Sequence, residues 1–104
     1  METRIESLTK MLSENPNDDF LIYAFALEIS KDKLSDAILL LEKLIQKNEN
    51  YLPTYYQLGK FYEQNKKPQQ AIVCFQEGMK IAQSQKNKKT FSELNEALQQ
   101  LLDE

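Results

Sequence analysis

The stretch Tyr55–Phe75, which reads YYQLGKFYEQNKKPQQAIVCF, decides the fold of this chain. Its first half places Leu58 and Tyr62 at helical spacing after the opening tyrosines, which predicts an amphipathic helix. A polar run and Pro68 interrupt the pattern, because proline favours the first turn of a new helix. Apolar residues return at helical spacing from Ala71 onward. The stretch therefore predicts two helices joined by a short turn.

The same helical spacing extends outward over the whole chain, and no segment shows the alternation expected of a strand. Helix 18–31 is apolar on nearly all sides, so it is either a core helix or one that presents a second exposed apolar face. Capping boxes, Thr3 with Glu6 and Thr90 with Glu93, are predicted to start the first and last helices. We expect helices at residues 3–14, 18–31, 34–47, 53–65, 68–85 and 90–102.

Small and large residues recur at a fixed interval along the chain. Ala37 and Ala71 are 34 residues apart, whereas Ala26 and Gly59 are 33 apart. The missing residue falls in the turn before residue 34, where a deletion is tolerated. An ordinary six-helix bundle is the alternative, but it has no reason to repeat in this way. The predicted repeat-packing residues are Phe25, Ala26, Ile29, Ala37 and Leu41, and then Leu58, Gly59, Tyr62, Ala71 and Phe75.

The pattern Tyr55-x2-Leu58-Gly59-x2-Tyr62, followed by Ala71-x3-Phe75, resembles the tetratricopeptide repeat signature, with Tyr55 in place of the usual Trp. A weaker copy begins at Ile22. The resemblance implies an all-α fold, a short right-handed α-solenoid of six helices in antiparallel pairs. It implies one domain over residues 1–104, with a half-repeat helix (1–15), a first repeat (18–51), a second repeat (52–85) and a cap helix (88–104).

Composition excludes several classes of function. The net charge of −3 argues against nucleic acid as the main partner. A chain with no His and one Cys offers neither a zinc site nor an internal disulfide. We expect no metal, no cofactor and no catalytic residues, so the chain is not expected to be an enzyme. The longest aliphatic run, Ala37–Leu41, is too short to span a membrane, and without a signal peptide the default location is cytoplasmic.

Three smaller features have simple interpretations. We expect Cys74 to be a partly buried structural thiol, because no positive charge or helix start lies beside it in the sequence. The pair Asp18 and Asp19 is interpreted as the solvated start of a helix. The basic cluster of Lys86, Lys88 and Lys89 is interpreted as a solvated turn.

In the resembled family, the first helix of each repeat lines a concave face that binds extended peptides. We choose six residues of the helices at 18–31 and 53–65 as lining that face, because aromatic side chains beside one lysine suit a peptide or helix of another protein. An alternative places Phe20 and Leu27 against a terminal helix. A second function is a structural homo-oligomer, such as a homo-dimer, that buries its apolar helix faces. The predicted groove residues are Phe20, Tyr23, Leu27, Tyr56, Gln57 and Lys60.

Overall fold

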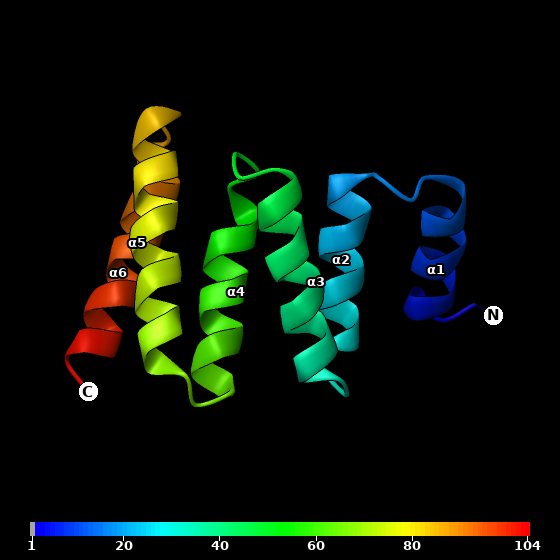
Figure 1. The fold of residues 1–104 in the computed structure, drawn as a ribbon, viewed down its shortest axis with the longest axis horizontal. Helices are drawn as coiled ribbons and strands as arrows, with labels where there is room; N and C mark the ends of the chain where they lie inside the picture. Colours follow the sequence, from blue (N-terminus) through cyan, green and yellow to red (C-terminus); the bar gives the residue numbers. More distant parts are fainter. Residues whose placement is uncertain (1) are drawn as a thin grey trace. The chain divides into compact units, whose positions relative to one another are not determined.

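The computed structural model describes residues 2–104, which contain six α-helices and no strand. Each helix begins and ends within two residues of its expected bounds, so the predicted all-α class is confirmed. Figure 1 shows the helices in chain order. They are α1 (Arg4–Glu14), α2 (Asp19–Ile29), α3 (Leu34–Lys47), α4 (Pro53–Gln64), α5 (Pro68–Ser84) and α6 (Lys88–Leu102).

The two predicted capping boxes have different outcomes. Thr3 caps α1 as predicted, because its hydroxyl oxygen accepts a hydrogen bond of 3.1 Å from the Glu6 backbone N–H. The second prediction is wrong. Asn87 caps α6 by accepting a bond of 3.0 Å from the Thr90 backbone N–H, so Thr90 already lies in the first turn. Asparagine is as good a cap as threonine, and the helix therefore starts at Lys88.

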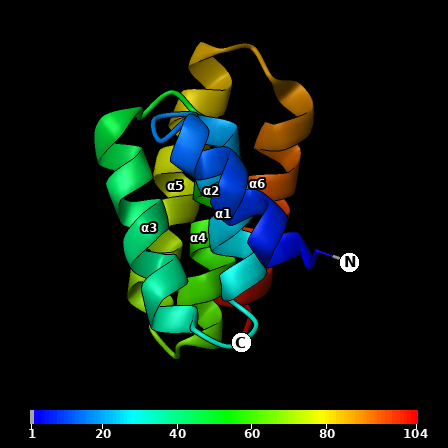
Figure 2. The same ribbon diagram turned by 90° about the vertical axis from the view of Figure 1, so that its right-hand side faces the viewer.

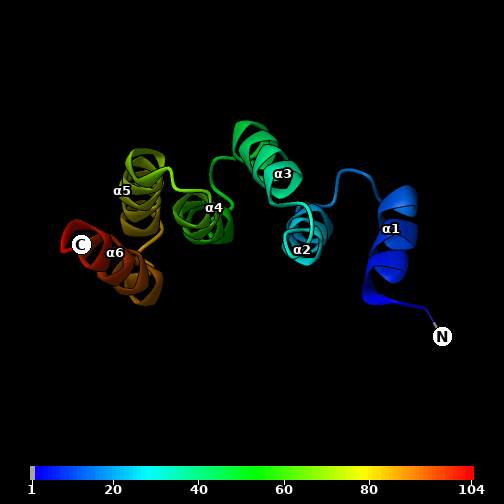
Figure 3. The same cartoon turned by 90° about the horizontal axis from the view of Figure 1, so that it is seen from below.

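The chain divides into two compact units, of which one ends at Tyr51 and the other begins at Leu52. In the first unit α2 packs against both α1 and α3, and in the second α5 packs against both α4 and α6. Within each unit, successive helices run antiparallel (Figures 1 and 2). A view along the helices shows α2 and α5 as the middle helices of their units (Figure 3).

Small residues allow α2 to lie between two neighbours. Ala24 and Ala26 are 5% and 0% exposed, and Ala37 on α3 is 0% exposed. Leu41 and Leu44 on α3 are also fully buried in this unit. The residues of the middle helix that are buried most completely are thus alanines, while its larger side chains are half-buried or exposed.

In the second unit, glycines mark the closest approaches. A Cβ atom added to Gly59 would lie 2.3 Å from Phe75 Cε1, so α4 and α5 touch where Gly59 has no side chain. A Cβ atom added to Gly78 would lie 2.7 Å from Tyr55 Cβ and 3.0 Å from Leu94 Cδ1, which brings α4 and α6 to the same point of α5. Gly78 was not among the predicted packing residues. The core of this unit also contains the fully buried Ala71 and Ala82.

Two lysines close helices in a backbone conformation that favours glycine. Lys66 and Lys86 have φ angles of 60° and 59°. After α4, the Lys67 N–H donates to the Tyr62 carbonyl at 2.9 Å and the Lys66 N–H donates to the Glu63 carbonyl at 3.0 Å. The same pair of bonds follows α5, where Asn87 and Lys86 are the donors. Both ends are Schellman motifs, in which a left-handed residue allows the last carbonyls to be satisfied.

Within residues 2–104, no helix combines the length and the apolar character that a membrane crossing requires.

Candidate binding surface

Helix α2 carries two apolar faces besides the alanines that contact its neighbours. At about 100° per residue, Phe20, Tyr23 and Leu27 fall on one side of the helix. A second set, Ile22, Phe25 and Ile29, falls on roughly the opposite side. We call these sets the Tyr23 face and the Phe25 face. Except for Phe20, which is exposed, all of these side chains are half-buried. Since Phe20 alone is exposed, α2 is neither a fully buried core helix nor a helix with a second fully exposed apolar face.

The Tyr23 face presents one exposed ring and one ring fixed from the side. Phe20 is 60% exposed, so the alternative that packs it against a terminal helix is wrong. The Tyr23 ring lies edge-on to Tyr51, with centroids 6.0 Å apart and planes at 71°. Tyr51 lies between α3 and α4 and was not predicted as a site residue. The sequence around Tyr51 does not predict this contact, because Tyr51 belongs to no helical pattern of apolar residues.

Both phenols of this pair stay neutral at ordinary pH. Burial and the neighbouring Tyr51 raise the pKa of Tyr23 above its usual range. Burial and the carboxylates of Asp19 and Asp18 raise the pKa of Tyr51. A neutral phenol can donate as well as accept a hydrogen bond, and its ring offers a rigid apolar contact. The pair can therefore hold a peptide group and an apolar side chain together.

The predicted groove residues of the second unit lie on one face of α4, which we call the Tyr56 face. Tyr56, Gln57 and Lys60 are all half-buried. The Tyr56 ring lies 6.3 Å from the Phe75 ring at 47°, so its inner edge rests on the core of the unit. The Lys60 ammonium lies 3.7 Å from a Glu63 carboxylate oxygen, in a partly exposed ion pair. A carboxylate on a ligand would compete with Glu63 for this cation.

The structure brings the six predicted residues together in two groups of three, one in each unit. Neither tyrosine is buried in a core. Whether a single ligand touches both groups remains a prediction.

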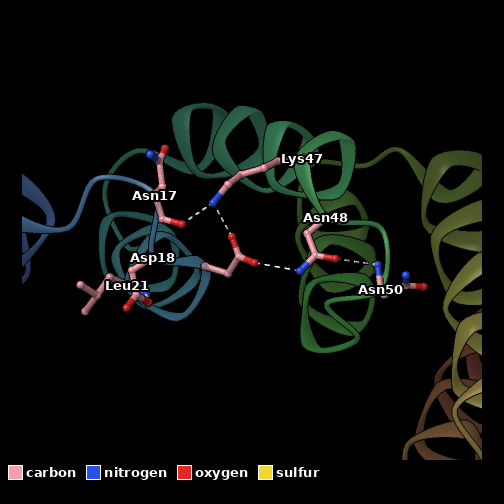
Figure 4. A network of polar contacts seen from close by, with 7 residues as sticks. Asn17, Asp18, Leu21, Lys47, Asn48 and Asn50 are labelled. Atoms are coloured by element: carbon pink, nitrogen blue, oxygen red, sulfur yellow. Dashed lines mark hydrogen bonds and ion pairs between the residues drawn. The ribbon is translucent and has the colours of Figure 1, made fainter.

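A polar cluster joins the start of α2 to the end of α3, and it was missed by the sequence analysis (Figure 4). The Lys47 ammonium lies 2.6 Å from Asp19 Oδ1 and also donates to the Asn17 carbonyl. Asn48 Nδ2 donates to Asp19 Oδ2 at 2.8 Å. Asp18 caps α2 by accepting a bond of 3.0 Å from the Leu21 N–H. We call the contacts of Asp19 with Lys47 and Asn48 the polar clamp.

The polar clamp corrects the interpretation of Asp18 and Asp19 as a merely solvated helix start. The hydrogen bonds from Asn48 and Lys47 hold the pKa of the Asp19 carboxyl below its usual value of 3.8. At the equivalent positions of the second repeat stand Leu52, Ile81 and Ala82. The first unit is thus fastened by charge at a place where the second repeat has apolar side chains.

Two observations concern the thiol and the possible metal ligands of the described residues. Cys74 is buried, with 9% of its surface exposed. No group of three or more His, Cys, Asp or Glu side chains in the described part of the chain could hold a metal ion. What the molecule presents instead is aromatic and apolar surface on helices, which is suited to binding.

Comparison with solved structures identifies the family. A tetratricopeptide repeat domain protein from Salinibacter ruber, solved by NMR, is 37% identical over 83% of this chain and 88% of that chain, with a TM-score of 0.80. A crystal structure of a tetratricopeptide repeat domain protein from the same organism is 35% identical over 84% and 98%, with a TM-score of 0.79. The chain belongs to the tetratricopeptide repeat (TPR) family.

A third solved structure supports the fold of this TPR chain. A protein from Bordetella parapertussis is 20% identical over 99% of this chain and 90% of that chain, with a TM-score of 0.85. No family model matches the sequence, and a comparison with curated proteins found no match. The TPR fold is that of a protein–protein interaction module, typically a non-enzymatic scaffold, so in general terms this chain is a module that binds other proteins.

Proposed function

We propose that this TPR chain binds a peptide or helical segment of a partner protein on the Tyr23 face and the Tyr56 face. The observation that carries the proposal is that both tyrosines rest against a second aromatic ring and still reach solvent. A ring held in this way loses little conformational entropy when a ligand covers it. Tyrosine is among the residues that contribute most to binding energy in protein interfaces.

Lys60 gives the proposed surface a preference for acidic segments. Its ion pair with Glu63 is partly exposed, at 3.7 Å, so a ligand carboxylate can replace that partner at small cost. We expect the affinity to fall as salt concentration rises, because exposed charges are screened.

The test starts from selection of a peptide ligand. A displayed library of random peptides is panned on the intact protein, and the affinity of an enriched peptide is measured by fluorescence anisotropy. Tyr23→Ala and Tyr56→Ala should each weaken binding by about 5- to 30-fold, which corresponds to roughly 1–2 kcal/mol. Val73→Ala is the matched control, because Val73 is exposed on α5 and lies on neither face.

The same measurement tests whether one ligand touches both faces. If it does, both tyrosine substitutions weaken binding of the same peptide. An effect of only one substitution would contradict the single-ligand prediction, and an effect of neither would contradict the proposed function.

Self-association through exposed apolar side chains is the second candidate. Ile5 and Met11 on α1 are 38% and 45% exposed, and Phe20 is more exposed still. Sedimentation velocity distinguishes the two candidates. A dimer that Phe20→Ser converts to a monomer would favour self-association, whereas a wild-type monomer supports peptide binding.

A further inference from the structure

Helix α1 covers one side of α2 and is held there by few interactions. The two helices pack against each other within the first unit. Leu8 is the only buried side chain of α1, with 4% of its surface exposed. In the described part of the chain, Arg4 and Glu28 form the only polar side-chain contact between α1 and α2, an ion pair of 3.3 Å. The attachment of α1 thus depends mainly on one leucine and one ion pair.

These two contacts lie one turn apart and define a binding site on α2. Arg4 and Leu8 are four residues apart, so they lie on the same side of α1. Because α1 and α2 run antiparallel (Figure 1), one turn forward along α1 corresponds to one turn back along α2, from Glu28 to Ala24. Ala24 is 5% exposed, as expected of a small residue covered by the leucine of α1. We call Ala24 and Glu28 the α1-binding site, and neither residue belongs to the faces described above.

The shortness of α1 makes its attachment weak. It has 11 residues, and isolated helices of this length are marginally stable in water, so α1 needs its contact with α2 to stay folded. In the second unit, α6 also packs against a middle helix, but it has 15 residues. Its buried side chains are Leu94, Ala97, Leu98 and Leu101. We therefore expect α1 to leave α2 more readily than α6 leaves α5.

The carboxylate of Glu28 sets the chemistry of any helix that replaces α1. Its side chain is only 18% exposed, and it lies between Arg4 and Lys31, whose ammonium is 3.0 Å away. When α1 leaves, this carboxylate loses one of its two cationic partners. A replacing helix with Arg or Lys one turn before a leucine restores both the ion pair and the apolar contact.

We infer that α1 is a tethered occupant of a helix-binding site on α2, and that a helix of another protein displaces it. The partner helix is amphipathic and carries the pattern of a basic residue followed four positions later by leucine, as in Arg4 and Leu8. The short connection between α1 and α2 gives α1 a high effective concentration, so the same helix from a second copy competes poorly. The partner therefore buries more apolar surface than α1 does.

The experiment measures the release of α1 and the binding of a replacing helix separately. Hydrogen exchange followed by NMR compares the amides of α1 with those of α6 in the intact protein. We expect the α1 amides to exchange at least about tenfold faster. A synthetic peptide with the sequence of residues 3–15 is the probe helix, and its affinity for the intact protein is measured by fluorescence anisotropy.

Variants of α1 should expose the site without altering it. Leu8→Ala should increase the affinity for the peptide about tenfold, because the fraction of molecules with an open site rises. Arg4→Glu should increase it about threefold, and since this change removes no buried side chain it keeps the test valid if Leu8→Ala does not fold. Lys10→Glu is the matched charge reversal at an exposed position of α1, and it should leave the affinity within about twofold of wild type.

A variant of α2 tests the site itself. When added to Leu8→Ala, Glu28→Lys should weaken peptide binding roughly threefold to tenfold. A peptide with glutamate in place of Arg4 should recover that loss, because it reverses both charges of the ion pair. Recovery by charge reversal distinguishes direct contact at Glu28 from a general change in the stability of α2.

The inference is overturned if α1 and α6 exchange at the same rate or if Arg4→Glu and Lys10→Glu have equal effects. It is also overturned if Glu28→Lys leaves peptide binding unchanged, because the peptide then binds elsewhere. A wild-type dimer that Leu8→Ala converts to a monomer in sedimentation velocity would overturn it as well, since the occupant is then a second copy.

Discussion

At position 59 the second repeat has no room for a methyl group. The site that a Cβ atom would occupy lies 2.3 Å from the Phe75 ring. The first repeat solves the same contact differently, because Ala26 and Leu41 stand at the equivalent positions and both are fully buried. A glycine with a phenylalanine and an alanine with a leucine are two ways of filling a similar space. The smaller residue on the first helix of the second repeat is therefore matched by a larger residue on its second helix.

Gly59→Ala should destabilise the protein by about 1–3 kcal/mol, because the added methyl forces the Phe75 ring or α4 to move. Adding Phe75→Leu should recover part of the loss, since it recreates the pair found in the first repeat. We expect a favourable coupling of about 1 kcal/mol between the two changes in a double-mutant cycle measured by urea unfolding. Strict additivity of the two changes would show that Gly59 and Phe75 do not share one space.

The sequence could predict Gly59 but not Gly78. Gly59 stands where Ala26 stands 33 residues earlier, so the repeat itself identifies it. Gly78 stands where the first repeat has Leu44, and its contact with Leu94 involves the last helix, which has no earlier copy in the chain. A close contact that occurs only once in the chain cannot be predicted from the repeat interval.

Among the helical elements, the ends of α4 and α5 store strain in the backbone. Lysine at φ near 60° costs more than glycine, because its Cβ atom crowds the backbone in the left-handed region. Each lysine remains there because the Schellman bonds satisfy the last carbonyls of its helix.

Lys66→Gly and Lys86→Gly should each stabilise the protein by about 0.5–1 kcal/mol, measured by thermal unfolding. Lys67→Gly is the matched control. Lys67 has a φ of −122°, which suits any residue, so glycine there only adds freedom to the unfolded chain and should destabilise. Stabilisation by all three changes would show that the left-handed conformation is not the cause.

The polar clamp makes the first unit sensitive to acid. The folded state holds the pKa of Asp19 below its value in the unfolded chain. Its contribution is therefore fully present above the unfolded pKa, near 4, and is lost as the pH falls through the lowered pKa. Asp19→Asn should cost about 1 kcal/mol or less at pH 7, and the difference from wild type should shrink as the pH falls below 4. Urea unfolding at pH 7, 4 and 2.5 measures this difference, and a constant difference would contradict the assigned role.

The ends of the helices could be predicted from the sequence, whereas the polar clamp could not. Proline, capping residues and apolar spacing act within a few residues, so they can be read along the chain. Asp19 meets Lys47 across 28 residues, and charged residues on a surface follow no period that would mark such a pair. Only the placement of α2 beside α3 brings these two side chains together.

For the molecule as a whole, the two units differ in how well they bury their large side chains. In the second unit Tyr55, Leu58, Phe75 and Leu94 are all less than 5% exposed. In the first unit Phe25 and other large residues of α2 remain half-buried. Each unit has three helices, but the second unit buries its large side chains more completely than the first.

We expect a fragment of residues 52–104 to fold alone as a helical unit. A fragment of residues 1–51 should be less stable by about 1–3 kcal/mol, the value of one well-buried large side chain. Urea unfolding followed by far-UV circular dichroism compares the two fragments. The prediction is wrong if the second fragment is unfolded or if the first is the more stable.

The candidate surface could be predicted in part at this scale. The period of a helix places Phe20, Tyr23 and Leu27 on one face, and the repeat interval relates Tyr23 to Tyr56. Tyr51, whose ring lies edge-on to Tyr23, is in the connection between α3 and α4, where helical spacing cannot predict the position of a side chain.

The polar clamp also decides where the backbone opens first. Its bonds join the first turn of α2 to the last turn of α3, and they are bonds that water and salt can replace. Amide hydrogens there should exchange with solvent sooner than those at the start of α4 and the end of α5, where Leu52 and Ala82 are buried instead. Added salt should hasten exchange at the first place and leave the second unaltered. Two repeats built on one pattern would then open at this same end on different timescales.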